Sequence, residues 1–125
     1  MNVLEKAQDL QNRIATGDIM GAFEEYYADN VTVVEANGEA REGKEAQREA
    51  IQQWMGSVKA MHGGGIGSIC ANEETGTATA ETWTDIEFQN GQRFRMDEVA
   101  VQKWEDGKIV HERFYYDVPP AQPGS

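Results

Sequence analysis

The stretch VAVQKWEDGKIVHERFYYD, residues 99–117, predicts two antiparallel β-strands joined at Asp106-Gly107. An Asp-Gly pair between alternating strands is the strongest short-range signal of a hairpin, because both central residues of the favoured turn need positive φ. The first strand alternates regularly up to Trp104, and the second ends in the aromatic cluster Phe114-Tyr115-Tyr116. This part of the chain is therefore a long hairpin whose second strand carries large side chains.

Two further strands precede this hairpin. Residues 77–88 alternate between apolar and polar side chains, and Asn90-Gly91 turns the chain into the hairpin's first strand, at residues 93–104. Residues 66–72 predict a shorter strand. It is entered through the glycines at 63–65, which we expect to form a flexible break and a gate over a pocket.

The first half of the chain has a mainly helical pattern. Apolar residues recur at helical spacing over residues 3–14, 19–27 and 44–58, and a short strand is predicted at 31–35. Helices grouped ahead of a strand meander indicate the α+β class rather than α/β. We expect one domain over residues 1–117. The Pro/Gly-rich residues 118–125 cannot join a sheet, so we expect a mobile tail there.

Composition limits the possible partners. The 125 residues carry 22 acidic and 11 basic side chains, a net charge of −11, which argues against nucleic acid and against an anionic membrane surface. The lone Cys70 cannot form an internal disulfide, and no segment reaches membrane-spanning length. We therefore expect a cytoplasmic protein. His62, His111 and Cys70 have no ligand spacing, so neither a metal site nor a cofactor is expected.

Four motifs together resemble the SnoaL-like proteins of the nuclear transport factor 2-like superfamily. They are Ala15-Thr-Gly-Asp18, Tyr27-Ala-Asp-Asn-Val-Thr-Val33, Arg41-Glu-Gly-Lys-Glu-Ala46 and Asp106-Gly-Lys-Ile-Val110. The resemblance covers residues 2–117. It implies a cone-shaped α+β barrel in which three N-terminal helices pack on a curved, mostly antiparallel sheet around a pocket. It does not imply one reaction, because this fold hosts many unrelated functions.

The resemblance implies candidate acids for that pocket. Glu35 occupies the place of the general base in the isomerases of the superfamily. It shares strand parity with Val33, so burial of that face would raise its pKa, whereas a strand-end glutamate pointing to solvent is the alternative. The isomerase oxyanion tyrosine falls near Leu10 and the isomerase aspartate near Val99, so steroid isomerisation is not implied. Asp97, two residues earlier and therefore on the same strand face as Val99, is the expected substitute if the register slips by a bulge.

The last strand adds a second candidate acid. The cyclases of the family use an aspartate there, and the matching position is Phe114. Glu112 lies one inward position earlier and could divide acid and base roles with Glu35. A pairing of Glu112 with Arg95 or another cation is the alternative. By family parity the inward residues would be Val110, Glu112, Phe114 and Tyr116, and the outward residues Ile109, His111, Arg113 and Tyr115.

Aromatic and aliphatic side chains are the candidate ligand contacts. They are Tyr27, Trp83, Val99, Val101, Phe114 and Tyr116. Trp83 stands on an otherwise polar strand face, and it marks either a pocket wall or a subunit interface. Because dimers through the outer face of the sheet are common in this superfamily, we expect a homodimer.

Two functional hypotheses remain open. The first is an enzyme that isomerises, dehydrates, cyclises or hydrates a small hydrophobic molecule by acid/base chemistry without a cofactor. The second is a non-catalytic ligand-binding or dimeric assembly domain. The enzyme requires an inward carboxylate with a raised pKa beside a donor such as Tyr27, Tyr116 or Trp83. The binding domain predicts inward acids paired with arginines, such as Arg93 or Arg95.

Overall fold

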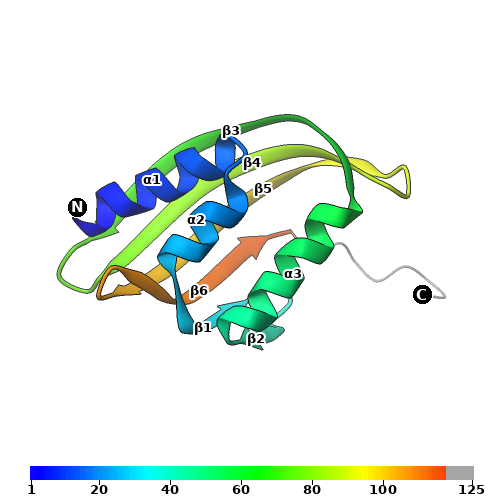
Figure 1. Ribbon diagram of the computed structural model, residues 1–125. Coiled ribbons are helices and arrows are strands. Elements are labelled where there is room, and N and C mark those ends of the chain that lie inside the picture. The colour runs from blue at the N-terminus through cyan, green and yellow to red at the C-terminus, as the bar shows by residue number, and fades with distance from the viewer. Residues whose placement is uncertain (118–125) are drawn as a thin grey trace.

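The computed structural model of the protein describes residues 1–117, which form three helices and six strands (Figure 1). In chain order the elements are α1 (Val3–Ala15), α2 (Ile19–Tyr26), β1 (Tyr27–Val34), β2 (Ala40–Glu42), α3 (Lys44–Ser57), β3 (Val58–Asn72), β4 (Thr77–Phe88), β5 (Arg93–Glu105) and β6 (Lys108–Tyr116). The predicted α+β class is confirmed. The tail predicted at 118–125 lies outside the described residues.

The six strands form one sheet in the order β2-β1-β6-β5-β4-β3. β1 and β6 run parallel, and all other neighbours run antiparallel. The sheet is curved, but among the described residues β2 and β3 have no strand on their outer sides, so this sheet does not close into a barrel (Figure 1). The helices pack on one side of the sheet, which we call the inner face, and the opposite side is the outer face.

Local sequence explains how the first helix is held. The Asn2 side chain accepts from the Glu5 N–H at 2.8 Å, and the Glu5 carboxylate accepts from the Asn2 N–H at 3.2 Å, which together form a capping box. The face of α1 that carries Ala7 and Leu10 is buried, and the helix packs on β3 and β4. α1 thereby covers one end of the inner face.

Aromatic side chains pack the second helix against β1 and β5 of the sheet. The Phe23 and Tyr27 rings lie 4.9 Å apart, and Tyr26 meets Trp104 edge-on at 5.5 Å. The large side chains buried in the same cluster include Leu10, Val31, Val33 and Ile109. The core therefore lies where α1 and α2 meet the middle of the sheet, beside the turn of the last hairpin.

That turn has the predicted chemistry, but the strands after it do not pair regularly. Asp106 and Gly107 both take positive φ, 51° and 79°, which confirms the hairpin. Pairing starts as Glu105 with Lys108 and Trp104 with Ile109, then continues as Lys103 with His111. Val110 is therefore an extra residue in β6, a β-bulge.

The bulge changes which residues share a face. Beyond it, Gln102 pairs with Glu112 and Glu98 pairs with Tyr116, one position away from the pairing of a regular hairpin. Ile109 is fully buried, whereas Val110 is only half-buried. The predicted orientations of Ile109 and Val110 are therefore wrong, because a strand with an extra residue reverses its alternation at that point.

Two other segments differ from the sequence prediction. Residues 63–65 are not a flexible break but belong to β3, where they pair with residues 83–85 of β4. A Cβ at Gly65 would collide with the indole of Trp83, so the missing side chain leaves room for that ring. β1 begins at Tyr27 rather than at residue 31. It follows α2 directly, since α2 ends at Tyr26. The pairing of β3 with β4 is also interrupted by register shifts at three places.

Candidate functional site

A cavity of about 760 Å³ lies between the inner face of the sheet and the helices. Large apolar side chains form much of its wall, among them Ile14, Ile51, Trp54, Met61, Ile66, Met96 and Phe114. Three acids line the same space, namely Glu35, Glu98 and Glu112. Cavities of this size and character hold small organic molecules, and a few polar groups fix the orientation of the ligand.

Glu112 is the most deeply buried of the three acids, with 1% of its surface exposed. Its Oε1 accepts a short hydrogen bond from the Tyr27 hydroxyl, and its Oε2 accepts from Gln102 Nε2 at 2.8 Å. Burial raises the pKa of Glu112 to about 7, although both hydrogen bonds act to lower it, and the charge of Glu35 adds to the rise. Glu112 can therefore gain or lose a proton near neutral pH.

The hydrogen-bond donors around Glu112 are held firmly. Burial raises the pKa of the Tyr27 hydroxyl well above its usual value, so Tyr27 keeps its proton. Gln102 is fully buried, and its Oε1 accepts from Trp104 Nε1 at 3.2 Å. An indole N–H can only donate, so the amide oxygen of Gln102 must face Trp104 and the amide nitrogen must face Glu112.

Glu98 is the cavity acid that the sequence prediction missed. It lies on β5, half-buried, and its carboxyl has no hydrogen-bond or ion-pair partner within residues 1–117. Burial raises the pKa of Glu98 to about 7, with further contributions from the charges of Glu112 and Glu35. One feature of the sequence does point to Glu98. It shares strand parity with Trp104, whose large ring is expected to be buried, so Glu98 is expected on the buried face as well.

Glu35 has a different environment at the edge of the cavity. Its Oε1 lies 2.5 Å from Arg41 NH2, and its Oε2 accepts from the Tyr116 hydroxyl at 2.7 Å. Arg41 is held in turn by Gln47 on α3, whose Oε1 accepts from Arg41 Nε at 2.9 Å. Burial and the bond to Glu35 raise the pKa of Tyr116 to about 12. This acid is therefore fixed as a paired carboxylate rather than a free base.

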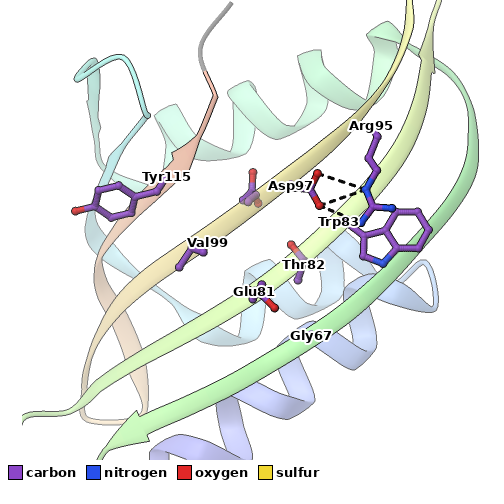
Figure 2. Close-up of a pocket in the computed structure, with 9 residues that line it drawn as sticks. Gly67, Glu81, Thr82, Trp83, Arg95, Asp97, Val99 and Tyr115 are labelled. Carbon is purple, nitrogen blue, oxygen red and sulfur yellow. Dashed lines mark hydrogen bonds and ion pairs between the residues drawn. The ribbon is translucent and has the colours of Figure 1, made fainter.

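The outer face of the sheet carries a separate hollow of about 340 Å³ (Figure 2). Arg95 lies over the Trp83 ring with its Cζ 4.3 Å from the ring centroid, and its NH2 lies 3.1 Å from Asp97 Oδ1. Figure 2 shows this pair at one side of the hollow and Tyr115 at the opposite side, with Asp97 and Val99 between them. Trp83 borders the inner cavity as well, because its strand separates the two hollows, but its indole lies on the outer side.

Several predicted site residues therefore need correction. Asp97 is exposed on the outer face, and Val99 and Val101 share its parity, so none of the three lines the cavity. A regular hairpin would have placed them opposite Tyr116, Phe114 and Glu112, respectively. The bulge at Val110 replaces them there with Glu98, Ala100 and Gln102.

The other predicted residues do meet at the cavity. Its lining includes Tyr27, Glu35, Glu112, Phe114 and Tyr116. Tyr27 and Tyr116 each donate to one of the acids, as the enzyme hypothesis requires. The suggested partners Arg93 and Arg95 bind Asp85 and Asp97 instead, so the alternative pairing of Glu112 with Arg95 is wrong.

Two negative findings apply to residues 1–117. No group of three or more histidine, cysteine or acidic side chains is arranged to hold a metal ion. None of the helices in this part of the chain has both the length and the apolar character needed to cross a bilayer.

Comparisons with solved structures agree with this architecture. A protein from Mesorhizobium loti, provisionally named a SnoaL-like polyketide cyclase, is 33% identical over 93% of this chain and 100% of its own, with a TM-score of 0.83. A provisionally named isomerase from Bacillus subtilis is 20% identical over 94% of this chain and 90% of its own, with a TM-score of 0.78. An NTF2-like protein of unknown function from Burkholderia pseudomallei is 14% identical over 94% and 92%, with a TM-score of 0.77.

These likenesses place the fold among the NTF2-like proteins. Among curated proteins, none matches the sequence significantly. The sequence model of the SnoaL-like domain matches residues 2–116, nearly the whole described chain. The chain therefore belongs to the SnoaL-like domain family.

Proposed function

We propose that the protein is an acid/base enzyme that moves a proton on a small hydrophobic carbonyl compound without a cofactor. The observation that carries this proposal is the pair Glu98 and Glu112 in one largely apolar cavity, each with its pKa raised to about 7. Groups that titrate near the working pH are the most effective acids and bases. The provisional names of two structural neighbours, cyclase and isomerase, describe reactions in which protons move.

The two acids have different tasks in this proposal. Glu98 has no partner among the described residues, so its ionised form can remove a proton from the carbon next to the ligand's carbonyl group. The electron pair moves to the carbonyl oxygen, which accepts a hydrogen bond from Tyr27. In this step neutral Glu112 donates to the Tyr27 oxygen, across the same contact in which ionised Glu112 accepts from the Tyr27 hydroxyl. Glu98 then returns the proton to a carbon of the ligand, which completes an isomerisation with no net gain or loss of atoms.

This division of roles predicts a bell-shaped dependence on pH. The reaction needs Glu98 ionised and Glu112 neutral, that is, one proton on the pair. Both groups titrate near 7, and two close carboxylates oppose each other's ionisation, so the singly protonated pair is most abundant near neutral pH.

Proton exchange tests the proposal without knowledge of the natural substrate. A panel of small cyclic ketones and enones is incubated with the protein in D₂O, and deuterium uptake next to the carbonyl is followed by NMR. We expect catalysed exchange with at least one class of ketone. Glu98→Gln should lower the rate by roughly two orders of magnitude or more, because it removes the base.

Asp97→Asn is the matched control, because it makes the same chemical change one residue away on the outer face. It should leave the exchange rate unchanged. Exchange that no panel member undergoes, or that survives in Glu98→Gln, would contradict the enzyme proposal.

A ligand-binding protein without chemistry is the second candidate. The ion pair of Glu35 with Arg41 favours it, because one cavity acid is already neutralised in the way a binding site requires. Its signature would be a rise in melting temperature with members of the same panel, without any deuterium uptake.

We propose further that two copies associate through the outer face. Tyr115 is 50% exposed beside Val99, across the hollow from the Trp83–Arg95 pair, and the face carries both Arg95 and Asp97. In a two-fold dimer each surface meets itself, so a surface with both signs of charge can complement its copy. Light scattering coupled to gel filtration should give twice the chain mass, and Tyr115→Glu should shift it toward the monomer.

A further inference from the structure

Four side chains form a continuous hydrogen-bonded series from the core to the cavity. Trp104 Nε1 donates to Gln102 Oε1, Gln102 Nε2 donates to Glu112 Oε2, and Glu112 Oε1 meets the Tyr27 hydroxyl. Their exposed fractions lie between 0% and 7%, and Tyr27 borders the cavity. Because bulk water hardly reaches these groups, they must satisfy one another.

The direction of donation is fixed from the Trp104 end. The indole can only donate, so the Gln102 amide cannot turn over, and Glu112 Oε2 always faces an N–H. When Glu112 is neutral, its proton must therefore lie on Oε1, pointing at the Tyr27 oxygen. The hydrogen of Tyr27 is then free to point into the cavity. When Glu112 is ionised, Tyr27 instead donates to Oε1.

We infer that Trp104 and Gln102 are positioning residues that hold the proton of neutral Glu112 on Oε1, so that the Tyr27 hydroxyl donates toward a bound ligand. This inference deepens the proposed function and rests on it for the role of the ligand. The position of the proton, however, is a property of the ligand-free protein. Successive donors that point the same way also polarise one another, which strengthens the last donor in the series.

A substitution at Trp104 does not alter the charged groups that surround Glu112. Gln102 of β5 and Tyr27 of β1 contact Glu112 directly. The other titratable or charged groups in the same cavity are Glu35 and Tyr116, Glu98 of β5, Arg41 of β2 and His62 of β3. Glu35 has its own counter-charge in Arg41. The neighbouring helices α1 and α3 add no charged group to the cavity wall, and their polar contributions are the amides of Gln11 and Gln47 and the indole of Trp54. Trp104 reaches Glu112 by hydrogen bonds through Gln102, so an uncharged substitution at Trp104 changes that series and leaves the charges around Glu112 as they are.

The test is the titration of Glu112 in the ligand-free protein, followed by infrared difference spectroscopy of the carboxyl band. Glu112→Gln identifies that band. Trp104→Phe should raise the midpoint by roughly half a pH unit, because Gln102 can then rotate and the ionised carboxylate loses a fixed donor. Gln102→Leu removes the donor outright and should raise it by about one pH unit or more.

Trp83→Phe is the control, since it makes the same substitution on the outer face, and it should leave the midpoint unchanged. A second measurement needs no variant. The indole N–H resonance of Trp104 in ¹⁵N-labelled protein should titrate with Glu112, and that of Trp83 should not.

The inference is overturned if both variants titrate like the wild type and the Trp104 resonance does not follow Glu112. None of these measurements uses a ligand. A failed exchange assay would therefore refute the proposed enzyme without affecting the inferred role of Trp104 and Gln102. An unchanged titration would refute that role without affecting the proposed enzyme.

Discussion

Glu112 is held inside the protein at a cost in stability. Its pKa rises from 4.5 in the usual environment to about 7 in the folded protein, so the folded protein keeps the proton over a range in which the unfolded chain has lost it. Below about pH 4.5, Glu112 is protonated in both the folded and the unfolded protein, and its contribution to the free energy of unfolding is fully present. It declines as the pH rises to about 7, and the loss is complete above that value.

Glu112→Gln should therefore stabilise the protein at alkaline pH. A neutral amide can accept from Gln102 and donate to Tyr27, as neutral Glu112 does, but it never ionises. At pH 8 we expect a gain of roughly 2 to 3 kcal/mol in the free energy of unfolding. Urea denaturation at pH 8 and pH 4 measures it, and a gain of equal size at both values would contradict the argument.

Tyr27 carries the contact with the ligand in the proposed reaction, so Tyr27→Phe should lower the exchange rate by roughly 100-fold. The phenyl ring keeps the packing against Phe23 while the hydroxyl is lost. Tyr115→Phe is the control, because it removes a hydroxyl from the outer face. Equal rates in the two variants would show that the Tyr27 hydroxyl has no part in the reaction.

At the scale of elements, one residue decides which acids share the cavity. The Asp106-Gly107 turn, the helices and the antiparallel meander of β3 to β6 could be predicted, because they depend on local turn chemistry and on periodicity. The strand β2 and the parallel pairing of β1 with β6 could not, because pairing between strands far apart in the chain leaves no local signal. The orientation of Glu112 was predicted correctly. The sequence favours Asp97 over Glu98, because residues 108–112, which contain the bulge, include no glycine that would indicate it.

Deletion of Val110 tests this explanation. Because Val110 is the extra residue, its removal keeps all other pairs between β5 and β6, and the variant should fold at a cost of about 1 to 2 kcal/mol. Glu112 should still titrate near neutral pH. Deletion of Val101 is the matched control, because it reverses the faces of the preceding part of β5 and should abolish cooperative unfolding.

At the scale of the whole molecule, the charge of −11 acts against the compact state. Some of the 22 acids are balanced locally, for example by the contacts of Arg48 with Glu24 and Glu45. Exposed ion pairs of this kind contribute little, whereas repulsion between the many unbalanced acids acts over a Debye length.

Added salt should therefore stabilise the protein. Raising sodium chloride from about 20 mM to about 500 mM shortens the Debye length several-fold, and we expect the melting temperature to rise by a few degrees. Differential scanning calorimetry at pH 8 measures the change. A fall in melting temperature would mean that the surface ion pairs outweigh the repulsion.

The open sheet has one more consequence, which concerns contacts between sheet edges. A long, regular free edge invites a strand from another molecule to add to it, and repeated addition builds fibres. Here one edge, β2, has only three residues, and the other, β3, is broken by three register shifts and contains consecutive glycines. Neither edge offers a long, regular ladder of donors and acceptors, so within residues 1–117 the sheet is a poor template for strand addition from another molecule.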